Sequence, residues 1–259
     1  MKPKTLIFRS AGTNCDAELA HAFKLAGAEV DALHVNHVIE HPEVLRQYDL
    51  LGLPGGFSYG DDIAAGRIYA NLLRHRLYPA LRQFIAAGKP VIGICNGFQL
   101  MVKAALLPGF DYPADAPPAQ LVTLADNTSM RFTDRWVGLR ANPSSVCIWT
   151  RDLDEFDLAI AHGEGRFMAP PEVLDRLEAN GQVALRYTDN PNGSQRDIAG
   201  ICDPTGLVFG LMPHPERFTH ATNHPHWTRQ LIAEPAGLRF FINAVEYVKQ
   251  HAGATAAGV

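Results

Sequence analysis

One junction near residue 95 constrains the fold of this chain more than any other feature. Residues 91–94 are a continuous apolar run, typical of a strand covered on both faces, and residues 97–107 have the periodicity of a helix. Gly93 and Gly97 stand two positions either side of Cys95, the spacing of a nucleophile elbow with cysteine in place of serine. The junction therefore predicts a strand, a strained turn and a helix, with Cys95 at the helix N-terminus, where the dipole and unpaired amides favour a thiolate.

The first half of the chain alternates between strand and helix patterns. Strands are expected at residues 5–8, 29–35 and 49–53, and helices at residues 16–25 and 63–87. This order predicts an α/β fold with a mostly parallel central sheet and helices on both faces.

The second half is different, because short apolar runs follow one another closely. We expect additional antiparallel strands there, with a hairpin turn at residues 203–206. The expected strands are 121–124, 135–139, 146–149, 158–161, 183–187, 198–202 and 207–211, and the expected helices are 171–180 and 237–250.

The composition excludes several classes of protein. The 23 Lys and Arg against 27 Asp and Glu, a net charge of −4, argue against a nucleic-acid-binding protein. No apolar run approaches the roughly 20 residues of a membrane span, and the N-terminus lacks the apolar core of a signal peptide. Cys15, Cys95, Cys147 and Cys202 form no Cys-x-x-Cys pair, so neither a disulfide framework nor a zinc ribbon is indicated. We expect a cytoplasmic protein that binds neither nucleic acid nor membrane.

His214 is the candidate base for a Cys95 nucleophile. Prolines flank it on both sides, it follows the strand expected at 207–211, and Glu216 stands two residues further on, near enough to orient the imidazole. A surface histidine in a proline turn is the alternative. The position just beyond a strand favours a site, because ligands of parallel sheets bind at the carboxyl ends of the strands.

Cys15 is a competing nucleophile, because it also follows a strand and opens a helix. Its neighbours two positions away are Thr13 and Ala17 rather than glycines, and the carboxylate of Asp16 would oppose a thiolate. These differences favour Cys95.

A thiolate that attacks a carbonyl also needs amides to stabilise the oxyanion. The candidates are the N–H groups of Asn96 and of Gly56, which lies in a glycine-rich loop after the strand expected at 49–53. The loop alone is equally compatible with an ordinary turn.

Several motifs of the chain, in their order along the sequence, resemble those of class I glutamine amidotransferases, whose triad is Cys-His-Glu. The closer resemblance is to the glutaminase subunits of phosphoribosylformylglycinamidine synthases, which act in the fourth step of purine biosynthesis. The resemblance implies a flavodoxin-like fold. Its strong motifs are residues 54–61, 93–99, 162–167 and 210–217, and its weaker ones are 12–16, 135–137, 187 and 190–194.

The resemblance assigns roles to the candidate residues. Cys95 would attack the side-chain amide of glutamine, and His214, oriented by Glu216, would protonate the departing ammonia. Gly56 and Asn96 would supply the oxyanion amides. A γ-glutamyl thioester would remain, and water activated by the histidine would release glutamate.

The resemblance also implies which residues hold the amino-acid end of glutamine. These are Gln99, His162, Gly163 and Glu164, with the carboxylate of Glu164 beside the α-ammonium and Gly163 allowing close approach of the backbone.

No phosphate-binding Gly-x-x-x-x-Gly-Lys-Ser/Thr loop occurs in the chain. The resemblance places ATP, magnesium and formylglycinamide ribonucleotide on a separate large synthase subunit, with a third small subunit as a further candidate partner. Because free ammonia would be lost, we expect glutaminase activity to be suppressed until the partner docks. This chain itself is expected to hold no cofactor and no metal, since no carboxylate or cysteine at ligand spacing completes a site with His220, His224 and His226.

We expect a single glutamine amidotransferase domain over residues 1–259, with insertions at 108–120 and 218–234. Two rival functions remain: a stand-alone cysteine hydrolase or peptidase of the same fold, and a non-catalytic binding module. A glutaminase that serves another acceptor is a third alternative. The presence of all three triad residues opposes the binding module, and the triad spacing favours the amidotransferase over a peptidase.

Overall fold

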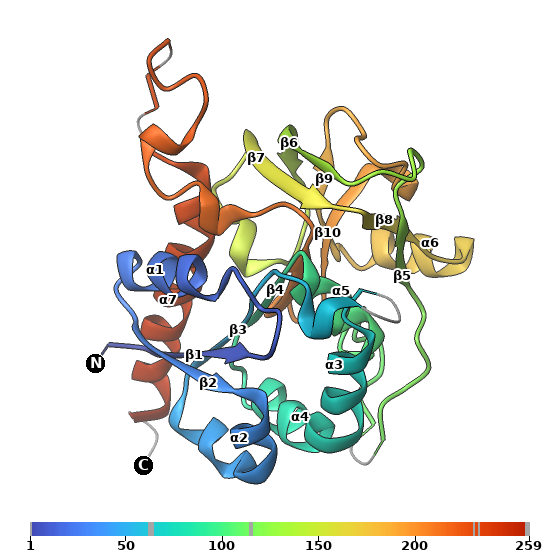
Figure 1. Ribbon diagram of the computed structural model, residues 1–259. Coiled ribbons are helices and arrows are strands. Elements are labelled where there is room, and N and C mark those ends of the chain that lie inside the picture. Colours follow the sequence, from blue (N-terminus) through green and yellow to red (C-terminus); the bar gives the residue numbers. More distant parts are fainter. Residues whose placement is uncertain (1, 62–64, 114–115, 230, 233, 257–259) are drawn as a thin grey trace.

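The computed structural model describes all residues except 1, 62–64, 114–115, 230, 233 and 257–259 (Figure 1). The strands are β1 (Lys4–Arg9), β2 (Glu29–His34), β3 (Leu50–Leu53), β4 (Val91–Ile94), β5 (Thr123–Asp126), β6 (Thr133–Ala141), β7 (Glu155–His162), β8 (Glu164–Met168), β9 (Val183–Tyr187), β10 (Ile198–Cys202) and β11 (Val208–Leu211). The helices are α1 (Asp16–Leu25), α2 (Val35–Glu40), α3 (Arg67–Leu72), α4 (Tyr78–Ala86), α5 (Asn96–Lys103), α6 (Pro171–Ala179) and α7 (Ala236–Ala256).

Within the described residues, nine strands form one sheet in the order β2-β1-β3-β4-β11-β10-β9-β6-β7. The strands from β2 to β11 pair in parallel, and those from β11 to β7 pair antiparallel. β5 and β8 form a separate antiparallel pair. The predicted α/β fold with a mostly parallel sheet and antiparallel additions is confirmed.

The parallel half is covered by helices on both faces. α1 packs against α7, whereas α3 and α5 pack against each other, and Figure 1 shows the two groups on opposite sides of β1, β3 and β4. The strand order reverses between β1 and β3, because β2 lies beyond β1 while β4 lies beyond β3. Loops at the carboxyl ends of strands diverge at such a point and leave room for a ligand.

Burial follows the position of each strand. Every residue of β3, β4 and β11 is buried, as expected for apolar strands between two helical layers. β2 lies at the edge of the sheet and none of its residues is fully buried, which explains its mixed sequence.

Several sequence-based boundaries are wrong. The expected strand at 146–149 is instead a loop that leads into the 3-10 turn Ile148–Thr150. The buried Trp149 indole N–H donates to the carbonyl of Leu207 (2.9 Å), so this apolar run is buried without joining the sheet. The described part of the helix expected at 63–87 is divided into α3 and α4 by the π-helical turn Leu73–Leu77, and its first two residues lie outside the described residues.

The helix expected at 97–107 ends early, at Lys103. Ala105 adopts a left-handed conformation with φ of 59°. The N–H of Leu106 then donates to the carbonyl of Met101 (2.8 Å), and the N–H of Ala105 donates to that of Val102 (3.1 Å). This pattern is a Schellman motif, which ends a helix without a glycine here.

The described residues of the segment 218–234 follow the turn Pro215–Arg217 and extend away from the sheet before α7 begins (Figure 1). Phe218 and His224 anchor its base on Trp136 of β6, with ring centroids 5.3 Å and 4.9 Å from the indole. Within the described residues, no helix is both long and apolar enough to cross a membrane.

The turn from β4 into α5 is tightly packed. Cys95 has φ of 52° and ψ of −108°, and its N–H donates to the carbonyl of Leu211 in β11 (2.8 Å). A Cβ on Gly93 would lie 2.7 Å from the carbonyl oxygen of Gly97, and a Cβ on Gly97 would lie 1.9 Å from that of Leu53. The predicted need for glycine on both sides of the cysteine is therefore a steric requirement of the fold.

We predict that Gly97→Ala lowers the free energy of unfolding by about 3 kcal/mol or more, because the new methyl group meets backbone rather than a movable side chain. Gly163→Ala is the matched control, since its Cβ would meet only Phe132, at 4.0 Å. Chemical denaturation of both variants tests this. Equal stabilities would show that the elbow tolerates a side chain.

Candidate active site

The candidate nucleophile and base meet at the carboxyl ends of adjacent strands. Cys95 follows β4 and His214 follows β11, and these strands pair in parallel. Gly55, which follows β3, lies close to the side chains of Cys95 and His214. A Cβ there would be 2.9 Å from His214 Cε1 and 3.5 Å from Cys95 Cβ. The N–H of His214 donates to the carbonyl of Ala159 in β7 (2.8 Å), which fixes the histidine backbone.

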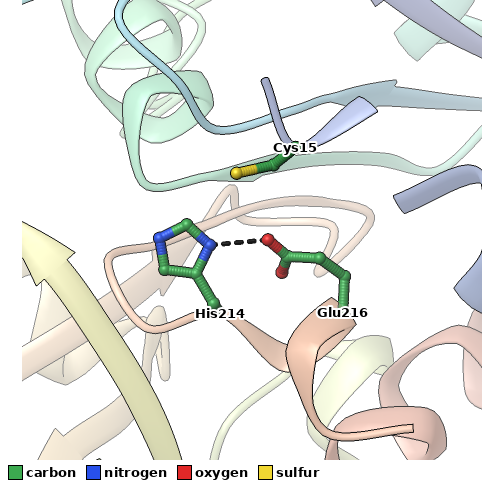
Figure 2. A group of neighbouring side chains, drawn as sticks. All are labelled: Cys15, His214 and Glu216. Atoms are coloured by element: carbon green, nitrogen blue, oxygen red, sulfur yellow. Dashed lines mark hydrogen bonds and ion pairs between the residues drawn. The ribbon is translucent and has the colours of Figure 1, made fainter. Parts of the chain in front are cut away.

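The His214 ring is oriented by Glu216, as Figure 2 shows. Nδ1 of the ring lies 2.6 Å from Oε1 of the carboxylate, and both side chains are buried. The 3-10 turn Pro215–Arg217 brings the two residues together. With its proton on Nδ1 for this bond, the neutral ring presents the lone pair of Nε2, which has no hydrogen-bond partner among the described residues.

The charge state of His214 follows from its surroundings. Complete burial lowers its pKa, but the carboxylate of Glu216 and the thiolate of Cys95 outweigh burial and hold the pKa well above the usual value. The imidazolium form of His214 is therefore favoured, and its positive charge suits the thiolate that a cysteine nucleophile uses for attack.

The competing nucleophile, Cys15, lies at the same site. Its sulfur donates to Oδ1 of Asn14 (3.1 Å) and accepts from Nη2 of Arg217 (3.2 Å). It caps α1 with φ of −102°, without the strained turn of Cys95. The sequence treated it as a rival of Cys95, and the structure makes it a neighbour of His214 instead (Figure 2).

The two candidate oxyanion amides differ in origin. Asn96 is the first residue of α5, so its N–H has no acceptor within the helix. Gly56 has φ of 142° and forms a bridge with Thr13, whose hydrogen bonds come from the N–H groups of Phe57 and Asn14. The Gly56 N–H is therefore not used by that bridge.

A cavity of about 270 Å³ brings most of the candidate residues together, but Asn96, His214 and Glu216 are not among the residues that line it. Phe57 and Phe132 stand at its rim, about half exposed, with ring centroids 6.2 Å apart. The sequence-predicted residues that line it are Gly56, Cys95, Gln99, His162, Gly163 and Glu164.

Asn96 and Gln99 connect the elbow to both walls of the cavity. The Asn96 carbonyl oxygen accepts from the Ser58 N–H (3.2 Å), and its amide donates to the side-chain oxygen of Gln99 (2.8 Å). The Gln99 amide in turn donates to the backbone carbonyl of Glu164. Both ends of Gln99 are therefore engaged by the protein, which makes it a support for the cavity wall as well as a lining residue.

Glu164 lies within a small group of charges. One oxygen of its carboxylate accepts from the N–H of Ala65 (3.2 Å), and the other lies 3.7 Å from Nζ of Lys103. Asp61 lies nearby, and burial raises its pKa, with a further contribution from Glu164. The carboxylates of Glu164 and Asp61 thus lie together at this end of the cavity with the ammonium of Lys103, and Arg67 adds a positive charge near Lys103.

His162 is buried and neutral. Burial, with the charge of His214, lowers its pKa to about 4. The Asn127 amide donates to the carbonyl of His162 (2.8 Å), so its oxygen accepts from Nδ1 of the ring (3.1 Å). Nε2 is then an acceptor without a partner among the described residues.

Two supports of the site had little sequence signal. Nothing in the sequence distinguishes Asn127 apart from its place directly after β5. The weaker motif at 190–194 has a structural role, because Asn192 donates to the carbonyl of Gly165 (2.9 Å) and Ser194 accepts from the N–H of Phe167 (3.0 Å). Both hold the start of β8 against the cavity.

The three histidines considered as metal ligands have different neighbours. His220 faces His21, with 3.4 Å between their Nε2 atoms. His224 lies 3.3 Å from a carboxylate oxygen of Asp157, and its ring packs against that of His226.

Comparison with known proteins identifies the class. The profile of the family described as the CobB/CobQ-like glutamine amidotransferase domain matches residues 2–248, so the chain belongs to that family. The resemblance to class I glutamine amidotransferases is thereby confirmed.

The similar proteins narrow the class further. The chain is 43% identical over 257 residues to the phosphoribosylformylglycinamidine synthase subunit PurQ of Dehalococcoides mccartyi, covering 96% of this chain and 99% of the relative. It is 40% identical over 270 residues to the PurQ subunit of Methanococcus maripaludis, covering 95% and 97%. A solved structure of PurLQS from Thermotoga maritima contains a chain with 30% identity and a TM-score of 0.74, covering 96% and 100%.

We predict that His162→Asn changes the pH dependence of stability. The unfolded chain binds a proton near the usual pKa of 6.5 and the folded chain only near 4, so the free energy of unfolding falls as pH falls through this window. Between pH 7 and pH 5 the wild type should lose about 2 kcal/mol more than the variant. Urea denaturation at both pH values tests this, and a constant difference between the two proteins would contradict it.

Proposed function

We infer that this chain is the glutaminase subunit of a phosphoribosylformylglycinamidine synthase, an enzyme of purine biosynthesis. The observation that carries the inference is the meeting of Cys95, His214 and Glu216 at the ends of β4 and β11, in a chain that matches PurQ subunits over nearly its whole length.

In the first half of the proposed reaction, the Cys95 sulfur attacks the side-chain amide carbon of glutamine. The developing oxyanion accepts hydrogen bonds from the N–H groups of Gly56 and Asn96. His214 holds its second proton on Nε2 and gives it to the departing nitrogen, so ammonia leaves and a γ-glutamyl thioester remains. Glu216 keeps Nε2 facing the reaction and stabilises the imidazolium.

In the second half, His214 accepts a proton from water as the water oxygen attacks the thioester. The carbon–sulfur bond breaks, and glutamate leaves. The sum is glutamine plus water to glutamate plus ammonia, with the thiolate and imidazolium restored.

The amino-acid end of glutamine is proposed to bind at the opposite side of the cavity. The negative charge of Glu164 and Asp61 suits the α-ammonium group, and Lys103 partly offsets it. Gly163 presents backbone without a side chain, and the Nε2 lone pair of His162 offers a further acceptor. Gln99 holds this wall in place.

The ammonia passes to the large synthase subunit, with which PurQ subunits act, and a small third subunit completes the complex. We propose that ATP and magnesium bind to the large subunit and that this chain needs no cofactor of its own. The exposed Phe57 and Phe132 at the cavity rim are suited to being covered by that partner. The proposed location of the complex is the cytoplasm.

We predict that Glu216→Gln lowers kcat for glutamine hydrolysis by about 100-fold to 10,000-fold, because a neutral amide neither fixes the tautomer of His214 nor stabilises its charge. Glutamate release by the complex with the synthase subunit measures this. Cys147→Ala is the control, because Cys147 lies beside Gly206, at the opposite end of β11 from His214. Equal activity of the Glu216 variant and this control would remove Glu216 from the triad.

A further inference from the structure

The proposed glutaminase mechanism leaves one buried group of the site unused, the thiol of Cys15. Its sulfur, a ring nitrogen of His214 and a carboxylate oxygen of Glu216 all lie within 4.8 Å of one another. All three side chains are buried, and Figure 2 shows Cys15 facing His214 and Glu216, which come from one turn of the chain. Among the described residues, no other group of three or more such side chains comes so close together.

The space between them exists because Gly55 has no side chain. A Cβ on Gly55 would lie 3.2 Å from the sulfur of Cys15 and 2.9 Å from Cε1 of His214. The guanidinium of Arg217 donates to the same sulfur at 3.2 Å and helps to fix its position. Thiolate and carboxylate together balance the charge of a divalent cation.

The donor set determines which cation fits. One sulfur, one imidazole nitrogen and one carboxylate oxygen are ligands that zinc accepts together, whereas magnesium and calcium prefer oxygen alone. We propose that Cys15, His214 and Glu216 form an inhibitory site for zinc or a similar thiophilic divalent cation.

Coordination displaces two protons, one from the Cys15 thiol and one from the bond between His214 Nδ1 and Glu216 Oε1, and both go to solvent. The cation then occupies the place of the Nδ1 proton, and the ring is neutral with its one remaining proton on Nε2. Because giving up that proton would leave an imidazolate, His214 no longer protonates the leaving ammonia. This inhibitory consequence rests on the proposed triad, whereas binding itself does not.

A second hollow, of about 530 Å³ and separate from the glutamine cavity, is lined by Glu216, Arg217, His21 and His220. The two histidines are exposed, and their Nε2 atoms lie 3.4 Å apart, a spacing suited to a first, weak contact with the cation.

Cobalt(II) is the probe, because it replaces zinc and its bond to a thiolate gives an intense near-ultraviolet absorption band. The full chain is titrated as wild type, Cys95→Ala, Cys15→Ala and Cys15→Ser, with circular dichroism to establish that each variant is folded. We expect the band in the wild type and in Cys95→Ala, and its loss in both Cys15 variants.

Two spectroscopic results would overturn the site. A band that survives in the Cys15 variants and disappears in Cys95→Ala would place the cation on the nucleophile, and absorption without any thiolate band would place it on the surface histidines.

The inhibitory effect has its own measurement. Zinc added to the complex with the synthase subunit should abolish glutamate release, and a chelator should restore it. If cobalt binds through Cys15 but zinc leaves glutamate release unchanged, the inhibitory consequence is wrong while the cation site stands. If glutamate release is absent before zinc is added, the failure belongs to the proposed function.

Discussion

The contact between Gly93 and Gly97 determines where the rest of the site lies. With no side chain at either position, α5 begins directly against the end of β3 and the chain reverses sharply at Cys95. The left-handed conformation of the cysteine turns its sulfur out of the strand and into the opening between the loops. A larger residue on either side would separate helix from sheet and remove the nucleophile from its partners.

The neighbouring strand supplies those partners because β11 lies parallel to β4. Its last carbonyl, on Leu211, accepts from the N–H of Cys95, so the histidine three residues later reaches the same end of the sheet. Burial alone would leave His214 neutral. The carboxylate of Glu216 reverses that preference, and an imidazolium becomes stable inside the protein. The pairing of two strands thus sets both the geometry and the charge of the triad.

The sequence predicted the elements whose signal is local. The glycines around Cys95 and the prolines around His214 indicate turns at the ends of apolar strands, and both turns occur where expected. The place of Cys15 was not predictable, because it depends on how the loop after β1 packs on Gly55. The role of Asn127 depends in the same way on the contact between distant loops. The strand expected at 146–149 was wrong because this run is apolar, as a buried strand is. The run is instead buried with the indole of Trp149, whose N–H donates to a backbone carbonyl.

Covalent labelling of the complex with a glutamine analogue that carries a diazoketone is the most direct test of Cys95 as the nucleophile of a glutaminase. Mass spectrometry of the intact chain, followed by peptide mapping, locates the adduct. We predict a single adduct on Cys95, prevented by excess glutamine. An adduct on Cys15, or labelling that glutamine does not prevent, would contradict the assignment of the elbow cysteine as the nucleophile of a glutaminase.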